Sequence, residues 1–250
     1  MDDPVLLTGA RGHVGTALLD YAGEEYDWRL LDRDPPADES AYPGEFFVAD
    51  ITDEDAVRDA MAGCGAVVHL AGDPRKTAPW SSVLSNNIDG THTVLQAAVD
   101  EGVEKFAFAS SNHAVKHFET DRRPDLYREH DDFLLDGDEL PRPGNLYGVS
   151  KATGETLGRF YHDEHDLSFV AVRIGNLTEE HPPKDYERGQ AMWLSYRDCG
   201  HLFQRTIEAD YDYEIVYGIS DNDRKYYSLE KAKRVLGYEP KDNSAEYDGE

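Results

Sequence analysis

Short apolar runs alternate with segments of helical spacing along the first 176 residues of the chain. Apolar residues recur every three or four positions in segments such as 17–22, whereas runs such as 66–70 are almost continuous. Continuous runs of this length are typical of strands buried on both faces of a parallel sheet. The alternation predicts an α/β fold with a doubly wound parallel sheet. We predict strands at residues 5–7, 28–31, 45–49, 66–70, 106–109 and 169–174, and helices near 17–22, 54–61, 81–99 and 147–161.

The glycines between the first strand and the first helix have the spacing G-x-x-G-x-x-G. Gly9 permits a tight turn, Gly12 lets backbone N–H groups approach a pyrophosphate, and Gly15 lets the helix pack closely on the strand. The phosphates of a bound dinucleotide would then lie at the N-terminus of the helix. Because a strand precedes the glycines and a helix follows them, we predict a dinucleotide-binding loop that includes His13 and Val14.

Residues at the ends of later strands extend the predicted cofactor site. Asp32 ends the second strand, about twenty residues after the glycines, where an acid accepts hydrogen bonds from the adenosine ribose and repels a 2′-phosphate. We therefore predict NAD over NADP, with Arg33 as a residue that could soften the preference; a turn-forming acid is the alternative reading of Asp32. Asp50 and Ile51 close the third strand as predicted adenine contacts. The remaining predicted cofactor contacts are Leu70, Ala71, Gly72 and Ile174.

Tyr147 and Lys151 lie four residues apart at the start of a predicted helix, so both side chains project from one face. A lysine ammonium held near a phenol is expected to lower the tyrosine pKa from about 10 toward neutral. Tyr147 is therefore a candidate general base for removing a proton from an alcohol. The pair alone is common on surface helices, but here it follows Ser111 at the end of the fifth strand, and all three are expected to converge at the nicotinamide end of the cofactor.

The pattern changes after residue 176. Pro182–Pro183 interrupts the chain, and the insertion at 121–144 is rich in proline and charge. We expect a helix near 199–209, a strand at 213–217, a helix at 228–236 and a frayed tail after Asp242. The predicted division is an NAD-binding Rossmann domain at residues 1–176 and a small substrate-binding cap at 177–250, whose last strand and helix return to the core.

The charge balance narrows the choice of partners. The chain has 51 acidic and 25 basic residues, a formal net charge of −26 and 39% hydrophobic residues. This acidity argues against nucleic acid or an anionic membrane as a partner. The apolar residues are still numerous enough to form a core, so we favour a folded protein whose carboxylate-coated surface suits concentrated salt, with an ordinary acidic protein as the alternative.

No apolar run reaches membrane-spanning length, we see no signal peptide, and we expect no metal site. Cys64 and Cys199 are expected in the core, and the protein in the cytoplasm.

With these motifs in place, the chain resembles the extended short-chain dehydrogenase/reductase superfamily. The resemblance rests on residues 8–15, 110–111 and 147–151 and covers nearly the whole chain. Residues 108–113, 146–151 and 172–175 are similar to uronate dehydrogenases, which oxidise the anomeric carbon of an aldose acid to a lactone. The full pattern, which includes residues 86–90, 189–198 and 218–223, is more similar to the NAD-dependent glucose-6-phosphate dehydrogenases of halophilic archaea.

The resemblance implies roles for the residues of the site. Tyr147 is implied as the acid/base, Lys151 as the group that stabilises its phenolate and binds the nicotinamide ribose, and Ser111 as a hydrogen-bond partner of the substrate oxygen. Asn112 and His113 would bind sugar hydroxyls, although His113 could instead cap a turn.

Arg188 matches the arginine that holds the uronate carboxylate, and an arginine can hold a phosphate equally well. A surface residue paired with acids is the alternative reading. Pro74 and Asn176 stand where uronate dehydrogenases have substrate-contacting serines, which argues against a uronate as the substrate. We still predict that Asn176 contacts the substrate. Further anion-binding candidates are Lys116, His117 and Arg197, whereas Asn87 is expected to support the site, His69 to be a core histidine, and Met192, Trp193 and Tyr196 to pack the cap.

The predicted function is NAD-dependent oxidation of glucose 6-phosphate at C1 to 6-phosphogluconolactone, with Tyr147 as general base and hydride transfer to NAD. The alternatives are a uronate dehydrogenase or another aldose 1-dehydrogenase, a nucleotide-sugar epimerase that holds NAD tightly, and a non-catalytic NAD(H) sensor. The superfamily also implies a homodimer that forms through the helices containing Ser81 and Tyr147.

Overall fold

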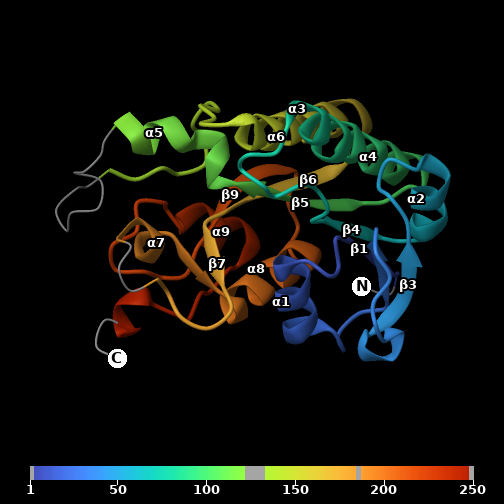
Figure 1. The fold of residues 1–250 in the computed structure, drawn as a ribbon, viewed down its shortest axis with the longest axis horizontal. Coiled ribbons are helices and arrows are strands. Elements are labelled where there is room, and N and C mark those ends of the chain that lie inside the picture. Colours follow the sequence, from blue (N-terminus) through green and yellow to red (C-terminus); the bar gives the residue numbers. More distant parts are fainter. Residues whose placement is uncertain (1–2, 122–132, 184–186, 248–250) are drawn as a thin grey trace.

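The computed structural model describes residues 3–121, 133–183 and 187–247, and within these ranges seven strands form one parallel sheet (Figure 1). Their order is β3-β2-β1-β4-β5-β6-β9. The chain winds outward from β1 in both directions, which confirms the predicted doubly wound Rossmann architecture. The strands are β1 (Val5–Thr8), β2 (Trp28–Asp32), β3 (Gly44–Val48), β4 (Ala66–His69), β5 (Lys105–Ser111), β6 (Ser168–Ile174) and β9 (Tyr213–Gly218), and a separate parallel pair is formed by β7 (Asn176–Thr178) and β8 (Trp193–Ser195).

Helices cover both faces of the sheet, as Figure 1 shows. On one face α1 (His13–Ala22) packs on α8 (Tyr196–Glu208), and on the other α4 (Gly90–Asp100) lies between α2 (Glu54–Met61) and α6 (Leu146–His165). The shorter helical elements are η1 (Glu39–Ala41), α3 (Trp80–Ser82), η2 (Val83–Asp89), η3 (Asn112–Val115), α5 (Lys116–Asp121), α7 (Glu187–Ala191), α9 (Glu230–Leu236) and η5 (Ser244–Tyr247).

Alternate residues of the strands serve two separate hydrophobic cores. Leu7, Val68 and Val170 belong to the core that includes residues of α1 and α8, whereas Leu6 and Val67 belong to the core under α2 and α4. Successive side chains of a strand point to opposite faces, so continuous apolar runs are what two covered faces require.

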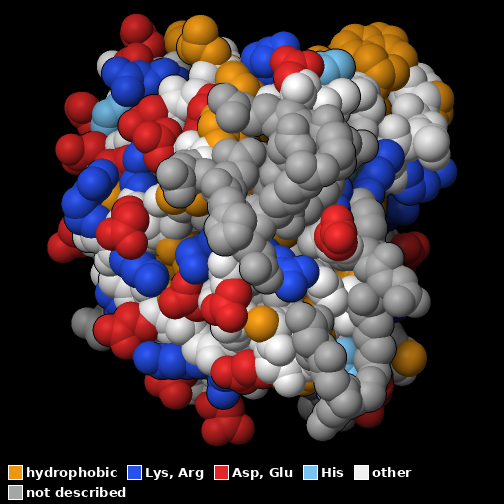
Figure 2. Space-filling model, turned by 90° about the vertical axis from the view of Figure 1, so that its left-hand side faces the viewer, with side chains coloured by type: hydrophobic (Ala, Val, Ile, Leu, Met, Phe, Trp, Pro, Cys, Tyr) orange, Lys and Arg blue, Asp and Glu red, His pale blue; other side chains and the backbone are white. Residues whose placement is uncertain are grey.

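Many acidic residues lie on the surface, whereas Glu119, Glu155 and Asp198 are buried. On the left-hand and lower parts of the face drawn in Figure 2, Asp and Glu side chains lie among Lys and Arg side chains. None of the helices in the described ranges combines the length and apolar character that a membrane crossing requires. Cys64 and Cys199 are both buried, as predicted.

Helix α6 lies unusually close to the sheet because glycines face it. A Cβ atom at Gly154 would lie 2.3 Å from a ring carbon of Phe108 on β5, and one at Gly158 would lie 2.2 Å from a ring carbon of Phe169 on β6. The aromatic rings therefore fill the space that larger helix residues would need. This packing fixes the distance between the sheet and the helix that contains Tyr147 and Lys151.

The helix predicted from about Ser81 to Val99 is confirmed, except that its segment Val83–Asp89 is a π-helix. The expectation about the end of the chain needs correction. The tail after Asp242, which we expected to be frayed, contains the short helix η5 at Ser244–Tyr247, and the backbone N–H of Ser244 donates to the buried side chain of Asn222. The remaining residues of the tail, 248–250, and residues 122–132 of the predicted insertion lie outside the described residues.

The part assigned to a cap is joined closely to the rest of the chain. Strand β9 pairs with β6 in the main sheet, and α8 packs on α1. The β7–β8 pair and α7 lie beyond the carboxyl end of β6. The division at residue 176 therefore stays a prediction about function.

We predict that Gly158→Ala destabilises the protein by about 1–2 kcal/mol, because overpacking against Phe169 outweighs the higher helix propensity of alanine. Thr156→Ala is the matched control on the exposed face of α6, and it should change the free energy of unfolding by less than about 0.5 kcal/mol. Denaturant unfolding in concentrated KCl measures both. Equal stability of Gly158→Ala and the wild type would contradict the packing argument.

Candidate active site

The glycine-rich loop joins β1 to α1 at the carboxyl edge of the sheet. Gly9 has a left-handed φ of +73°, and a Cβ atom there would lie 2.7 Å from the backbone nitrogen of Ala71. Helix α1 begins after Gly12, and no side chain caps its first N–H groups. These groups are therefore available to an anion at the positive end of the helix dipole, which fits the pyrophosphate of a dinucleotide.

Asp32 is placed beside this loop. Its carboxylate accepts a hydrogen bond of 3.0 Å from the backbone N–H of Arg11, and Arg33 next to it is exposed. An acid in this position fits an adenosine ribose better than a 2′-phosphate. The carboxylate of Asp50 accepts bonds from the backbone and hydroxyl of Thr52, while Ile51 is buried and packs against Gly90 of α4.

Other predicted cofactor contacts surround the same edge. Leu70, Ala71 and Gly72 follow β4, and the backbone N–H of Ala71 donates to Thr8. Ile174 ends β6 and is partly buried. His13 is exposed at the start of α1, and its ring lies within 3.1 Å of the Tyr196 hydroxyl. Tyr196, which we expected to pack the cap, is therefore a neighbour of the cofactor loop that sequence reasoning missed.

The structure brings Tyr147, Lys151 and Ser111 together. The ammonium of Lys151 lies 5.6 Å from the centre of the Tyr147 ring and 4.9 Å from that of Phe108, and the Ser111 side chain is near enough to the Tyr147 phenol to act on its pKa. Lys151 is buried at the carboxyl end of β5, opposite Gly72. A phenol, an ammonium and a hydroxyl therefore converge beside the glycine-rich loop.

The pKa of Tyr147 corrects one expectation. Burial raises the pKa of the phenol above its ordinary value of 10.0, and the Ser111 side chain only partly opposes this. Burial also lowers the pKa of Lys151 to about 8, against the opposing charge of Glu155. The lysine alone therefore does not bring the phenol toward neutrality in the protein without its cofactor.

Asn145 positions both the helix and a neighbouring histidine. Its side-chain oxygen caps α6 by accepting from Gly148 N at 2.8 Å, and its amide nitrogen lies 2.9 Å from His113 Nδ1. The His113 ring packs edge-on against Tyr147, with the ring centres 5.9 Å apart. His113 thus belongs to the site, and an asparagine directly before a predicted helix was the signal that could have revealed the cap.

Asn87 supports the site from the π-helix, as expected. Its amide accepts from Asp73 N at 2.6 Å and donates to the Asp73 carbonyl and to the Ser150 hydroxyl. Ser150 in turn donates to the carbonyl of Tyr147. One buried amide therefore ties the loop after β4 to the first turn of α6.

His69 is a core histidine, as predicted. It is fully buried between the hydroxyls of Thr8 and Thr91, and burial lowers its pKa to about 3. The ring is therefore neutral, and it joins the glycine-rich loop to the helix that contains Asn87.

Arg188 is buried rather than on the surface. Its Nε donates at 2.6 Å to Glu119, whose carboxylate also contacts Lys116 and accepts from the Tyr226 hydroxyl. Glu119 was missed because a single acid in a charged segment carries no sequence signal. Arg197 pairs with Asp242 and is half exposed, and His117 is exposed.

Asn112 and Asn176 flank the methionine that follows α7. The amide of Asn112 lies 3.3 Å from the sulfur of Met192, and the backbone of Asn176 donates to the Met192 carbonyl. Both positions are compatible with the predicted substrate contacts, which remain predictions.

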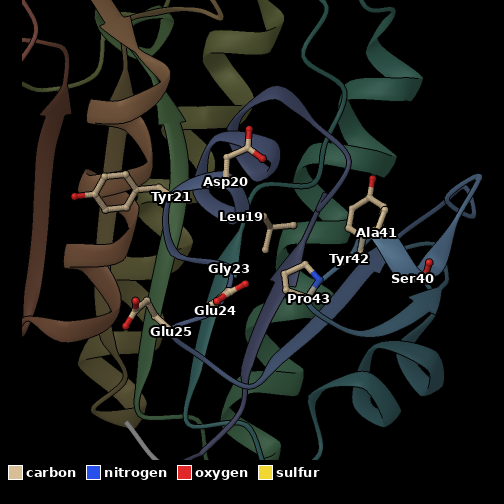
Figure 3. A pocket seen from close by; sticks show the side chains of 10 residues that line it. All are labelled: Leu19, Asp20, Tyr21, Gly23, Glu24, Glu25, Ser40, Ala41, Tyr42 and Pro43. Carbon is tan, nitrogen blue, oxygen red and sulfur yellow. The ribbon is translucent and has the colours of Figure 1, made fainter.

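A pocket of about 530 Å³ lies elsewhere, between the end of α1 and the segment before β3 (Figure 3). It contains none of the predicted site residues. Its lining consists of Leu19, Asp20, Tyr21, Gly23, Glu24, Glu25, Ser40, Ala41, Tyr42 and Pro43.

The fold and this arrangement of residues define a dinucleotide-binding protein with an acid/base site. Residues 5–196 match the model of the NAD dependent epimerase/dehydratase family, and the chain belongs to that family. The predicted membership of the extended short-chain dehydrogenase/reductases is thereby confirmed.

Three similar proteins refine this placement. The chain is 71% identical to an NAD-dependent glucose-6-phosphate dehydrogenase of Haloferax volcanii, over 99% of this chain and 96% of that protein. It is 34% identical to a uronate dehydrogenase of Pseudomonas putida, over 96% of this chain and 84% of that protein. The structure of a glucuronic acid dehydrogenase from Chromohalobacter salexigens superimposes with a TM-score of 0.85 at 31% identity, covering 99% of this chain and 87% of the other.

The buried lysine yields a prediction about stability. Its pKa falls from 10.5 to about 8 on folding, so the unfolded chain binds more protons between these values and stability should rise with pH across that window. Below about pH 8 the full cost of burying the charge is present. Lys151→Met should therefore stabilise the cofactor-free protein by about 1–3 kcal/mol at neutral pH and by much less near pH 10.5.

Denaturant unfolding at both pH values measures this difference. Lys233→Met removes a half-exposed lysine and should change stability by less than about 0.5 kcal/mol. A Lys151→Met variant less stable than the wild type at neutral pH would show that its neighbours more than compensate for the buried charge.

Proposed function

We propose that this chain is an NAD-dependent dehydrogenase that oxidises glucose 6-phosphate at C1 to 6-phosphogluconolactone. The observation that carries the proposal is the convergence of Tyr147, Ser111 and Lys151 beside a glycine-lined loop with Asp32 at its edge. The high identity to the Haloferax volcanii enzyme over the full chain supports the choice of substrate.

Each residue of the site would have a separate role in the oxidation of the alcohol. Ser111 and Tyr147 would hold the C1 hydroxyl between them, and Tyr147 would remove its proton. Lys151 would stabilise the phenolate and bind the nicotinamide ribose. Bound NAD supplies the hydride acceptor and a positively charged ring, which adds to the charge of Lys151.

NAD is preferred over NADP in this proposal because Asp32 would repel a 2′-phosphate. Gly9, Gly12 and Gly15 with His13 and Val14 would hold the pyrophosphate. The substrate would lie beyond β5 and β6, in contact with Asn112, His113 and Asn176, and Arg188 would hold its anionic group. These roles are supported by the places of the residues at the carboxyl edge of the sheet.

Three alternatives differ in what they predict. Arg188 would hold a carboxylate as readily as a phosphate, so a uronate or another aldose could be the substrate. A nucleotide-sugar epimerase would return the hydride to the sugar and release no NADH. A non-catalytic NAD(H) sensor would have no need of a Tyr147–Lys151 pair with a buried lysine.

We predict NADH formation from NAD and glucose 6-phosphate in concentrated KCl, with far slower reaction for glucuronate, galacturonate and free glucose. Tyr147→Phe should lower kcat by about 10²–10⁴-fold, the usual contribution of a positioned acid/base. Tyr161→Phe is the matched control on the same helix, because its hydroxyl contacts only Gln96 among the described hydrogen bonds. Its kcat should stay close to that of the wild type.

Each alternative has its own outcome in this assay. Turnover of the uronates alone would replace glucose 6-phosphate by an acid sugar. NAD that copurifies, with no NADH from any sugar, would favour an epimerase. Full activity of Tyr147→Phe would overturn the role of the tyrosine.

We also propose a cytoplasmic, salt-adapted homodimer. Two cysteines without a disulfide and an NAD cosubstrate fit the cytoplasm, and a net charge of −26 fits concentrated salt. For the dimer, the support is apolar surface on the helices proposed to meet. Phe160 of α6 is 53% exposed, and Trp80 and Leu84 near the start of the neighbouring helix are 49% and 37% exposed.

Phe160→Asp should therefore convert a dimer into a monomer in high salt, as measured by light scattering on a sizing column. Val48→Asp, on the distant strand β3, is the matched control because Val48 is 51% exposed. It should leave the mass unchanged. A wild-type protein of monomeric mass would overturn the dimer.

A further inference from the structure

The buried carboxylate of Glu119 on α5 contacts two cationic side chains. Glu119 is completely buried, and the same carboxylate oxygen contacts the ammonium of Lys116 and, at 2.6 Å, Nε of Arg188. Its other oxygen accepts from the Tyr226 hydroxyl at 2.6 Å. Burial opposes the ionisation of Glu119, but Arg188, Lys116 and Tyr226 together lower its pKa to about 2. Glu119 is therefore ionised and holds a lysine and an arginine side by side.

This cluster lies next to the acid/base site. Lys116 follows His113 by three residues, and the ring of His113 packs against Tyr147. On the other side, the Tyr226 hydroxyl that contacts Glu119 lies 3.7 Å from the sulfur of Met192, which contacts Asn112. The cations are thus separated from the reacting end of the site by the residues predicted to hold the sugar. In a hexose 6-phosphate, likewise, the phosphate is held away from the reacting carbon C1 by the C5–C6 arm and the ring oxygen.

The electrostatic environment of His113 supports an anion site. Burial, together with the positive charges of Lys76, Arg188 and Lys116, lowers the pKa of His113 to about 4, and Glu119 opposes these effects. Three cations around one position are unusual in a chain of net charge −26. Lys76 is exposed, so concentrated salt screens it, whereas Lys116 and Arg188 are largely buried and keep their effect.

We propose that Lys116 and Arg188 together form the binding site for the phosphate of the substrate, and that Glu119 is the positioning residue that holds both cations. The inference rests on the proposed function and names the residues that select its substrate class. A phosphate monoester carries a charge of about −1.5 to −2 at neutral pH and three acceptor oxygens, so it gains from a second cation. A carboxylate carries one charge and is satisfied by the arginine alone.

Kinetics of Lys116→Gln test the proposal. The KM for glucose 6-phosphate should rise about tenfold to a hundredfold, the usual effect of losing a charge-assisted contact, while kcat changes little. The inhibition constant of inorganic phosphate against glucose 6-phosphate should rise in parallel, and Lys116→Arg should restore most of both. Arg58→Gln, on α2 at the far end of the molecule, removes the same charge and should change neither constant.

An unchanged KM, or a fall in kcat at constant KM, would overturn the phosphate site and leave the proposed oxidation standing. If the wild type oxidises no phosphorylated sugar, the proposed function fails, and calorimetry of inorganic phosphate then tests the site by itself. The wild type should bind phosphate and Lys116→Gln should bind it more weakly. Equal binding by the two proteins, or none by either, would overturn the site.

Glu119→Gln tests the positioning role without reference to activity. This variant leaves Lys116 and Arg188 close together without the carboxylate, and added phosphate should replace the lost negative charge. Inorganic phosphate should therefore raise the thermal midpoint of Glu119→Gln more than that of the wild type. Glu119→Asp should behave like the wild type. Equal shifts for wild type and Glu119→Gln would show that Glu119 does not organise an anion site.

Discussion

The close contact between α6 and the sheet is the constraint on which the active site depends. Gly154 and Gly158 lie directly over Phe108 and Phe169, and a Cβ atom at Gly148 would lie only 2.2 Å from the carbonyl oxygen of His113. A helix with larger residues at these places would move away from the strands. Tyr147 and Lys151 would then lose their contact with Ser111 and Phe108 at the end of β5. The geometry of the site therefore depends on the glycines of α6 as much as on the catalytic groups.

The same close packing buries charged side chains, and neighbouring groups of opposite charge offset part of the cost of burying them. Burial removes the Lys151 ammonium from water and lowers its pKa. The negative charge of Glu155, one turn further along α6, opposes this change. Glu155 is itself held by two bonds of 2.8 and 2.9 Å from the fully buried Arg173 and by one from Ser110. An ion network of this kind is a poor source of stability but a good way to orient charges. Such costs are expected where a site needs an unusual pKa.

Much of this could be predicted from the sequence because the informative features are local. The glycine spacing, Asp32 at a strand end and the four-residue step from Tyr147 to Lys151 each depend on neighbours in the chain, and together they fixed the fold and the cofactor loop. The Glu119–Arg188 and Arg173–Glu155 pairs could not be found this way, since their members are 69 and 18 residues apart. The direction of the Tyr147 pKa was also wrong, because burial depends on the packed structure and no spacing rule contains it.

The central claim is that Tyr147 takes a proton from the C1 hydroxyl while the hydride of C1 passes to NAD. Glucose 6-phosphate deuterated at C1 tests this most directly, with mass spectrometry of both products. We expect the deuterium to appear in the reduced NAD and the sugar product to be the lactone or its hydrolysed acid, without deuterium at C1. Reduced NAD without deuterium, or a sugar that retains it, would contradict oxidation at C1.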